Sequence, residues 1–494
     1  GSTKSFMNLI LYLKNVNTDF MVICPNKQGK YQELVKRKIP VKALMYKLNA
    51  YPSLNSLKNI VLYIPRLVRL LLANWKSCQD LYKIATAYRP DIIHTNVSVI
   101  NIGYKTAKRM EYLPFSGIRA VMEKATKMQQ AGEKVIHLEI GRPDFDTPKK
   151  IKDAAYESLN AGHVFYTSNY GTPALRKEIA KWENEHHNVN YETSEVLVTV
   201  GVGEATYASM AAFLEEGDEV LVPNPVWLNY IHVPSSLGAT PVTYSLKEEN
   251  DYQIDFEELE SKITEKTKMI VVVNPSNPTG GIFSRKTLEK LSEIAIRNDL
   301  LVVSDEIYSQ LVYDGAEHVS IASIPGMKER TITLGGFSKA YSMTGWRLGY
   351  MCAPEGIISA CVRVHQYTIT CASSFVQDAA ITALNECADD VEAMRQEYQR
   401  RKDFMVKALN DIDGISCNNP QGAFYIFVNV KSLGMTSMEV AEYLLEHAKV
   451  ALVPGSAFGS EGEGYLRISY ACSYEDLQEA AKRIREAVAE LKAR

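Results

Sequence analysis

Three short apolar runs in the chain are each followed within five residues by a side chain with hydrogen-bonding or reactive chemistry. The runs are residues 269–273, 301–303 and 331–334, and the side chains are those of Asn277, Asp305 and Lys339. Helical patterns separate the runs, which predicts parallel strands joined by helices. Because parallel strands end at one edge of a sheet and ligands bind at that edge, the three residues mark a candidate site.

The charge of the chain divides into two opposite parts. The 494 residues carry a formal net charge of −3, with 46% hydrophobic and 23% charged residues, as in an ordinary globular protein. Residues 1–110 contain 18 Lys and Arg against 4 Asp and Glu, whereas residues 111–494 contain 37 against 54. The length suggests about two to four domains, and the asymmetry is a reason to analyse the two parts separately.

The basic part, residues 1–110, alternates between strand and helix patterns. Strands are expected at residues 19–25, 41–45 and 91–96, and helices at 5–14, 31–38 and 57–88. This order predicts an incomplete, parallel, Rossmann-like βαβ segment. The lysines and arginines of residues 57–83 could contact an anionic membrane or nucleic acid, but an ordinary amphipathic helix explains them better. We therefore expect no stable membrane association and no nucleic-acid partner.

Three stretches of the basic part carry a family resemblance. GSTKSFMNLILYLK, DFMVICP and RPDIIHTN are similar to the N-terminal domain of family-4 GT-B glycosyltransferases. In that family a strand with a Gly-rich turn comes before the first of these stretches, and a C-terminal domain binds the sugar nucleotide. Neither is recognisable here, so we expect a truncated segment without a complete active site and without glycosyltransferase activity.

The cysteines, the histidines and the hydropathy bear on three questions: the redox compartment, a metal site and a membrane-spanning helix. The eight cysteines form no C-x-x-C pair, which favours free thiols in a reducing compartment and a cytoplasmic protein. The nine histidines show no ligand spacing, and the adjacent His186 and His187 are expected in a solvated loop, so no metal site is predicted. We also expect no signal peptide and no membrane-spanning helix, because no apolar run is long enough.

Individual charged residues of the acidic part require partners. Asp305 ends a buried strand, where a lone carboxylate is costly unless it meets a positive group. Lys339 follows a buried strand, where a lysine with a lowered pKa can form an imine with a carbonyl compound. Arg347 offers a forked donor suited to phosphate, and Arg467, inside an apolar strand pattern, needs an anion such as a substrate carboxylate.

The ordered set of these residues carries the second resemblance. From about Pro114 to the C-terminus, the chain resembles the fold-type I, class I/II aminotransferases, which use pyridoxal 5′-phosphate. The residues that match in order are Asn277, Asp305, Lys339, Arg347 and Arg467. The resemblance implies a large mixed-sheet, cofactor-binding domain at 151–390, a small α+β domain at 111–150 and 391–494, and a homodimer with shared active sites.

The resemblance also implies a role for each matching residue. Lys339 would form the Schiff base with the cofactor and move the substrate proton, Asp305 would pair with the ring nitrogen, and Tyr308 and Asn277 would bind the ring oxygen. Trp227 would stack on the ring. The phosphate would be bound by Val202, Gly203, Glu204, Arg347 and, from the neighbouring subunit, Tyr166. Arg467, Asn277 and the backbone of Gly141 would bind the α-carboxylate of the amino acid.

Two departures from the family affect these expectations. Many relatives have a Ser three residues before the lysine, where this chain has Gly336, so one hydroxyl contact to the phosphate is missing or supplied elsewhere. Aspartate-specific relatives commonly have a Lys where this chain has Gly203, which weakens an aspartate-specific reading without excluding it. Ser116, Gly117, Ile118 and Phe165 would line the side-chain end, and they favour a neutral or aromatic amino acid as donor.

The expected reaction is a ping-pong transfer of the amino group from an L-amino acid to a 2-oxo acid, most simply 2-oxoglutarate. Carbon–sulfur β-lyases and aminocyclopropane-carboxylate-synthase-like enzymes share the same lysine, aspartate, tyrosine and arginines, so they stay open as alternatives. A regulatory or binding protein with this fold is a further alternative, as is a scaffold role for residues 1–110. The products formed from a panel of amino donors distinguish the enzymatic alternatives.

Overall fold

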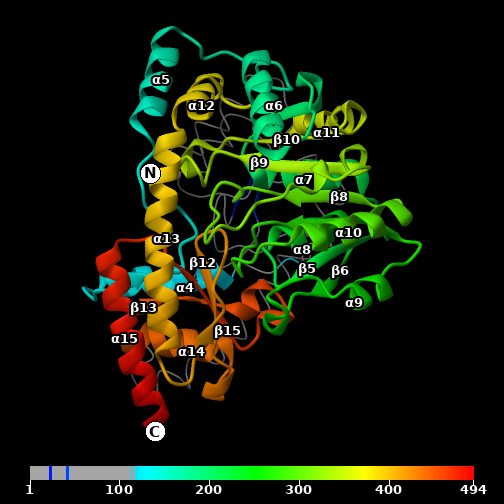
Figure 1. Cartoon of the computed structure of the whole chain (residues 1–494). Helices are drawn as coiled ribbons and strands as arrows, with labels where there is room; N and C mark the ends of the chain where they lie inside the picture. The colour runs from blue at the N-terminus through cyan, green and yellow to red at the C-terminus, as the bar shows by residue number, and fades with distance from the viewer. Residues whose placement is uncertain (1–21, 25–40, 44–112, 114–116, 494) are drawn as a thin grey trace. The chain divides into compact units, whose positions relative to one another are not determined.

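The computed structural model describes residues 22–24, 41–43, 113 and 117–493 (Figure 1). The chain divides into two compact units, Gly1–Ala107 and Lys108–Arg494. In the first unit, strands β1 (Val22–Cys24) and β2 (Val41–Ala43) pair in parallel. The strand expected at 91–96 and the helices expected at 5–14, 31–38 and 57–88 lie outside the described residues, as do most residues of the glycosyltransferase-like stretches.

The second unit is built on a seven-stranded sheet with the order β4-β10-β9-β8-β7-β5-β6. All neighbours in this sheet are parallel except β10, which runs antiparallel to both β9 and β4. The strands are β4 (Val196–Thr199), β5 (Glu219–Asn224), β6 (Thr240–Ser245), β7 (Thr267–Val273), β8 (Leu301–Asp305), β9 (Thr331–Gly336) and β10 (Gly349–Cys352). The sheet is therefore mixed, as the sequence predicts.

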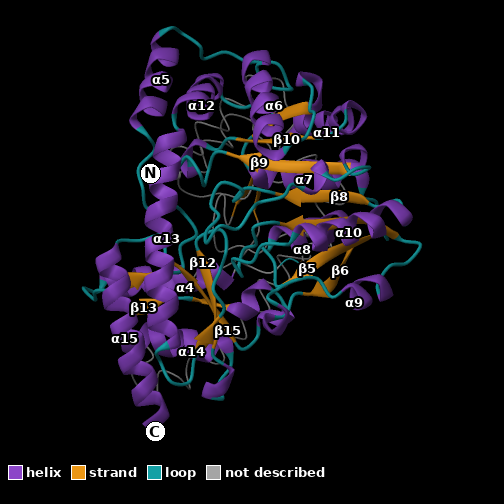
Figure 2. Cartoon of the chain, viewed as in Figure 1, coloured by secondary structure: helices purple, strands orange, loops and turns teal. Residues whose placement is uncertain are grey.

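Helices cover the large sheet because its central strands are apolar on both faces (Figure 2). In β7, every residue but Lys268 is buried. The helices of this region are α5 (Lys149–Asn160), α6 (Pro173–His187), α7 (Val202–Phe213), α8 (Asn229–Leu237), α9 (Phe256–Ser261), α10 (Arg285–Arg297), α11 (Glu355–Thr368) and α12 (Ser374–Glu386). At the N-terminus of α10, the Ser284 side chain accepts a hydrogen bond from the Thr287 amide, which satisfies one otherwise free donor.

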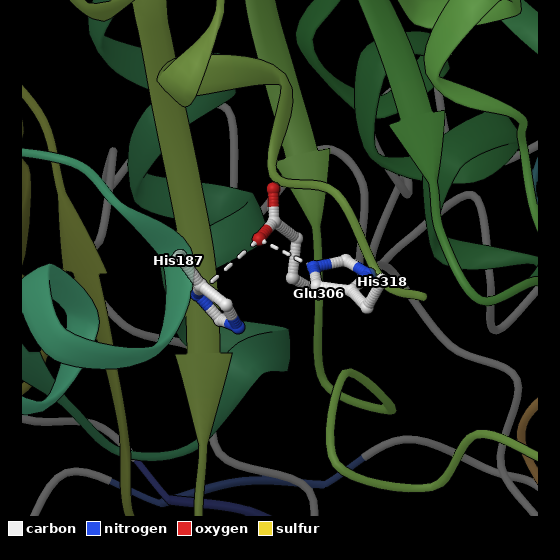
Figure 3. A group of neighbouring side chains, drawn as sticks. All are labelled: His187, Glu306 and His318. Carbon is white, nitrogen blue, oxygen red and sulfur yellow. Dashed lines mark hydrogen bonds and ion pairs between the residues drawn. The ribbon is translucent and has the colours of Figure 1, made fainter. Parts of the chain in front are cut away.

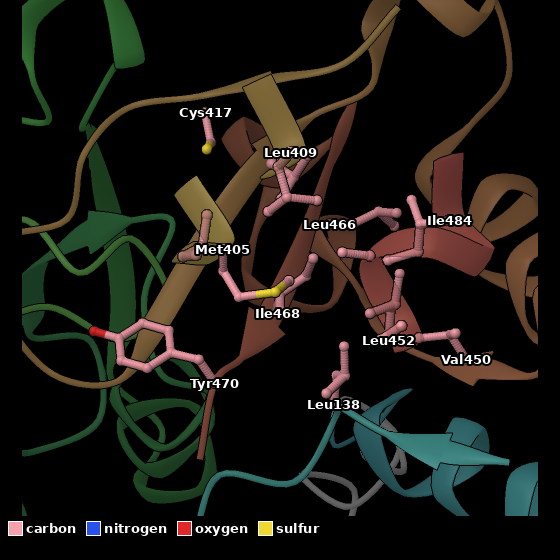
Figure 4. Close-up of a cluster of buried hydrophobic side chains, with 14 of the residues drawn as sticks. Leu138, Met405, Leu409, Cys417, Val450, Leu452, Leu466, Ile468, Tyr470 and Ile484 are labelled. Carbon is pink, nitrogen blue, oxygen red and sulfur yellow. The ribbon is translucent and has the colours of Figure 1, made fainter. Parts of the chain in front are cut away.

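A second, antiparallel sheet of order β11-β12-β15-β14 forms the other core (Figure 4). Its strands are β11 (Ser416–Cys417), β12 (Tyr425–Asn429), β14 (Val453–Pro454) and β15 (Tyr465–Ser469). The long helix α13 (Ala388–Asn410) packs beside α15 (Tyr474–Ala493) against this sheet. Also here are α4 (Gly117–Gln130), α14 (Ser437–Tyr443) and a parallel pair of β3 (Ile136–His137) with β13 (Val450–Ala451).

The buried side chains of the second core join residues far apart in the chain. Leu138 from the segment after β3, Met405 from α13, Ile468 from β15 and Ile484 from α15 belong to one apolar cluster (Figure 4). Since the segment around Leu138 precedes the large sheet and the others follow it, the chain leaves this core and returns to it. Both crossings bring site residues toward the carboxyl ends of β7, β8 and β9.

Two strands cover less of the chain than their sequence patterns predict. Residues 135–140 and 422–430 both have the pattern of a strand, but β3 covers only Ile136–His137 and β12 only Tyr425–Asn429. The prediction of a solvated loop at His186 and His187 is wrong. Both residues end α6, and His187 is buried because it lies one helical turn after Glu183 and bonds to it. No helix among the described residues is long and apolar enough to cross a membrane.

Candidate functional site

Lys339 lies three residues after β9, at the edge where β7 and β8 also end. Its Nζ donates a hydrogen bond to the Gly141 carbonyl oxygen at 2.6 Å and lies 5.5 Å from the ring centres of Tyr308 and Phe424. Burial lowers the pKa of Lys339 to about 8, with help from the positive charge of Arg467 and against the charge of Asp305. A neutral, nucleophilic amine is thus accessible near neutral pH.

Asp305 is the last residue of β8 and is buried. Its Oδ2 accepts a hydrogen bond from the Tyr230 hydroxyl at 2.6 Å, and its Oδ1 accepts one from the Ile307 amide at 3.1 Å. Burial raises the pKa of Asp305 to about 6, although both hydrogen bonds and the Lys339 charge act to lower it. No local sequence pattern indicates a role for Tyr230, because only the fold brings α8 next to the end of β8.

Arg467 enters the same site from β15 of the other sheet. Only 1% of the residue is exposed, and its guanidinium donates to Asn277 Oδ1 at 3.0 Å and to the Glu139 carbonyl at 2.8 Å. The guanidinium carbon lies 4.4 Å from the ring centre of Tyr425. The Nε atom of Arg467 is buried and has no hydrogen-bond partner among the described residues, so the site contains an unused donor on a buried cation.

Two tyrosines lie beside the charged groups of the site, Tyr308 next to Lys339 and Tyr425 next to Arg467. The hydroxyls of Tyr308 and Tyr425 are 2.8 Å apart, and both side chains are buried. A Cβ atom on Gly141 would lie 2.6 Å from the Tyr425 hydroxyl, so only glycine allows this approach. Tyr308 was predicted from its motif. Tyr425 was missed, and its place in an apolar strand gave no signal of a polar role.

A cradle for an anion lies at the N-terminus of α7. The helix begins at Val202 after Gly201, which has a φ of 79° and provides no side-chain cap, so the first amides are not satisfied by the helix. A Cβ on Gly201 would lie 2.5 Å from Nη2 of Arg347, which places that guanidinium against the cradle. The Glu204 side chain points elsewhere, since it accepts from the Val200 amide and pairs with His365.

Gly336 lies beside the same cradle. A Cβ atom there would lie 3.1–3.2 Å from Ile307, Gly349 and Val202, which is tighter than ordinary packing. The glycine at this position therefore allows β9 to approach β10 and α7 closely. A serine would need these neighbours to move, which gives a structural reason for the departure from the family pattern.

The side chains of the other expected residues form no hydrogen bond with this centre among the described contacts. Tyr166 is 88% exposed and Phe165 is 81% exposed. Trp227 is half-buried and packs against the apolar clusters on both faces of the large sheet. Gly117 approaches Ala457, whereas Ser116 and the side chain of Ile118 fall outside the described residues.

Comparison with known proteins identifies the family. Residues 133–484 match the family described as Aminotransferase class I and II. The chain belongs to this family. An aspartate aminotransferase of Pyrococcus abyssi is 44% identical over 78% of this chain and 98% of its own length. An aromatic-amino-acid aminotransferase of Thermococcus litoralis is 42% identical over the same shares.

The fold agrees with solved structures of the family. An aspartate aminotransferase from Rhizobium meliloti superimposes with a TM-score of 0.76 at 36% identity, over 78% of this chain and 99% of that chain. The expectation of an aspartate-aminotransferase-like α/β fold is therefore confirmed for this part of the chain. The chain is an aminotransferase, and its family depends on pyridoxal phosphate.

The described residues fit this cofactor. The cofactor has an anionic phosphate, a basic ring nitrogen and an aldehyde, and the site offers an uncapped helix N-terminus, a buried carboxylate and a lysine with a lowered pKa. Neither Asp305 nor Lys339 forms an ion pair among the described side chains. Each group is thus available to a ligand of complementary charge.

The pKa of Lys339 predicts selective labelling in the protein freed of cofactor. Reductive methylation with formaldehyde should modify Lys339 with a half-maximal rate near pH 8, because its neutral amine dominates above that value. A short lysine-containing peptide in solution serves as the control and should react half-maximally only near the ordinary lysine value of about 10.4. Mass spectrometry measures the labelling of both. Equal pH dependence of Lys339 and of the peptide would contradict the lowered pKa.

Proposed function

We propose that Lys339 holds the cofactor covalently and, once the substrate displaces it, takes the α-proton of the amino acid at Nζ. The lowered pKa supports this role, since the amine must be neutral to accept a proton. The Gly141 carbonyl, 2.6 Å from Nζ, fixes the end of the lysine side chain. The single observation that carries the proposal is the presence of this amine beside an unpaired carboxylate and an unpaired guanidinium in one site.

Asp305, Tyr308 and Asn277 hold the ring in this proposal. Pyridoxal phosphate, when bound, supplies an electron-withdrawing ring that stabilises the negative charge left on the substrate when its α-proton is removed. Asp305 keeps the ring nitrogen protonated, because a buried carboxylate is stabilised by a positive partner. Tyr308 and Asn277 would donate hydrogen bonds to the ring oxygen, and Trp227 would stack on the ring.

The phosphate and the substrate carboxylate have separate binding groups. We assign the phosphate to the α7 N-terminus at Val202, Gly203 and Glu204, through backbone amides, and to Arg347. We assign the α-carboxylate to Arg467, which has a free Nε, together with Asn277 and the backbone at Gly141. The Glu139 and Asn277 contacts fix the orientation of Arg467 before substrate arrives, which reduces the entropic cost of binding.

Substitutions should separate these two roles. Lys339→Ala should abolish turnover and the absorbance band of the covalently held cofactor, because the amine that forms the covalent bond is removed. Arg467→Ala should mainly raise the KM for the amino acid, by about tenfold or more, since a charged hydrogen-bonded pair to the substrate is lost. Steady-state kinetics and absorbance spectra measure both effects, with Lys149→Ala as the control. Full activity of Lys339→Ala would refute the assignment.

We propose a neutral or aromatic L-amino acid as the donor and 2-oxoglutarate as the acceptor. Gly203 supports this preference, because it leaves the first turn of α7 without a positive side chain for a second carboxylate. The similar proteins include both an aspartate aminotransferase and an aromatic-amino-acid aminotransferase, so activity must be measured with both kinds of donor. A β-lyase is the competing activity, and it would release pyruvate and ammonia without any oxo-acid acceptor.

A single substitution tests the substrate preference. A Cβ at Gly203 has only Asn229 Nδ2 nearby, at 3.6 Å, so a longer side chain fits this position. Gly203→Lys should raise kcat/KM for aspartate relative to phenylalanine by about tenfold, because the new cation can pair with the side-chain carboxylate. Gly203→Gln is the neutral control and should not change the ratio. Aspartate preferred over phenylalanine by the unmodified enzyme would overturn the proposal.

We also propose a homodimer with shared active sites and the division into a small domain (111–150 and 391–494) and a large domain (151–390). Exposed apolar side chains support the dimer, since Val164, Phe165, Tyr166 and Tyr367 are 57–88% exposed. A hydrogen bond from Ser374 to the His163 carbonyl fixes the chain just before the first three of these residues against the start of α12. The glycosyltransferase-like origin of residues 1–110 and the cytoplasmic location stay predictions from the sequence.

Subunit mixing tests the shared site. A dimer of Lys339→Ala with Tyr166→Ala subunits should recover activity that neither variant has alone, because one of its two sites then has both residues intact. Phe404→Ala, at a partly buried position in the core, is the stability control. Analytical ultracentrifugation gives the oligomeric state of the full chain and of a chain without residues 1–110. A fully active monomer would refute the dimer.

A further inference from the structure

Next to Asp305 in the chain, Glu306 belongs to a cluster of buried charged or polar side chains that has no role in the functions described above. Its other members are His187, His318 and Glu183, and Figure 3 shows Glu306 with the two histidines. Glu306 follows Asp305 in the chain and turns away from the ligand edge. Its Oε2 accepts a hydrogen bond from His318 Nε2 at 3.0 Å and lies 3.8 Å from His187 Nδ1. His187 Nδ1 is in turn 2.7 Å from Glu183 Oε2, so His187 lies between two carboxylates.

The charges in this cluster can be assigned from its contacts. Burial acts to lower the pKa of His187, but Glu183 and Glu306 outweigh it and raise the pKa to about 9, so His187 is a cation at neutral pH. Burial acts to raise the pKa of Glu306, but His318, His187 and the Ser304 hydroxyl lower it below the ordinary value. Nε2 of His318 bonds to Glu306, whereas its Nδ1 is buried without a partner among the described residues.

The remaining groups that face the cluster are neutral. The Tyr350 hydroxyl on β10 donates to Glu183 Oε1 at 2.6 Å, and the Ser304 and Ser320 hydroxyls donate to Glu306 Oε1 at 2.7 and 2.9 Å. Burial raises the pKa of the other titratable neighbours well above their ordinary values, so they carry no charge: Tyr191, Tyr350 and Cys352. His187 is thus the cation that compensates Glu183 and Glu306.

Asp305 faces the opposite side of the same strand end. Its own charged and titratable neighbours are Lys339, Tyr230, Tyr308 and Glu306. The Glu306 anion disfavours the ionised form of Asp305, whereas the Lys339 cation favours it. Because Glu306 is adjacent and buried, whatever compensates its charge also acts on Asp305 through a medium that screens poorly.

We propose that Glu306 and His187 are positioning residues whose opposite charges together set the ionisation of Asp305 at the cofactor's ring nitrogen. The proposal rests on the proposed role of Asp305. An uncompensated Glu306 would favour protonated Asp305, which cannot pair with a protonated ring nitrogen, and an absent Glu306 would make Asp305 a stronger acid. His187 offsets Glu306 and keeps Asp305 ionised over the range in which the lysine is active.

A divalent cation is the alternative source of compensating charge. The donor atoms of His187, Glu306 and His318 all lie within 4.8 Å of one another, which is a spacing that could hold a metal ion. Hydrogen bonds already occupy His187 Nδ1, which bonds to Glu183, His318 Nε2, which bonds to Glu306 Oε2, and Glu306 Oε1, which accepts from the serines. Protons therefore satisfy the cluster, and elemental analysis of the purified holoenzyme should find less than stoichiometric zinc or other divalent metal.

Two substitutions with opposite predicted signs test the proposal. Glu306→Gln removes an anion beside Asp305, so the acid limb of the kcat/KM profile should move to lower pH, by about one pH unit. His187→Gln removes a cation, so the limb should move to higher pH by a similar amount. The double variant should lie near the unmodified enzyme. His186→Gln, at the exposed neighbouring position, is the matched control and should not move the limb.

Cofactor affinity gives a second measurement that does not depend on turnover. The dissociation constant of pyridoxal phosphate is measured against pH by equilibrium dialysis of the full chain, and the break at acid pH should shift in the same directions. Loosening of the fold would admit water to Asp305 and lower its pKa in both variants, so a rise for His187→Gln cannot come from structural damage. If Glu306→Gln does not fold, the pH dependence of cofactor affinity in His187→Gln alone tests the proposal.

The outcomes also separate this inference from the proposed function. Asp305→Asn should weaken cofactor affinity and reduce turnover by more than tenfold, and if it does neither, the assigned role of Asp305 fails. If Asp305→Asn has these effects but both cluster variants leave the acid break in place, the inference alone is overturned. Shifts of the same sign in both variants, or one equivalent of bound divalent metal, would also overturn it.

Discussion

The site depends on charges that the protein buries without pairing them to one another. Asp305 and Arg467 are buried, Lys339 lies between them, and no ion pair joins any two of these side chains among the described contacts. A buried charge without a partner is unfavourable, so keeping these groups apart reduces the stability of the folded protein. A ligand that carries both a cation and an anion gives these groups partners, which makes its binding more favourable. A cofactor with bound amino acid is such a ligand.

Holding these groups apart requires both sheets. Arg467 comes from β15, yet its hydrogen-bond partner Asn277 is 190 residues earlier, after β7 of the large sheet. Lys339 follows β9, and the carbonyl that orients it belongs to Gly141, 198 residues earlier. Arg467 and Lys339 are thus each held by a contact between segments of the two cores, whereas the hydrogen bonds of Asp305 lie within the large-sheet region. The large core around β7 and β8 and the small core around β15 must both form before the site has its geometry.

The sequence predicted the parts of this site that follow local rules. Apolar runs before Asn277, Asp305 and Lys339 predicted strand ends, and the structure places all three at the same edge. Tyr230 and Tyr425 could not be found in this way, because aromatic residues in apolar stretches are usually core residues, and only the tertiary fold directs their hydroxyls to Asp305 and Tyr308. His187 was assigned to a solvated loop because its local stretch is polar, whereas its neighbours Glu306 and His318 lie more than 100 residues away in the chain.

The ligand site and the charged cluster meet at the end of β8, where Asp305 belongs to the site and its neighbour Glu306 belongs to the cluster. Successive residues of a strand point to opposite faces, so Asp305 faces the ligand edge and Glu306 must face the protein interior. An acidic pair at this position therefore introduces a second buried anion that the fold has to neutralise. The turn from β8 to His318 and the last turn of α6 supply that neutralisation. The helix and loop behind the sheet are thus coupled electrostatically to the carboxylate in front of it.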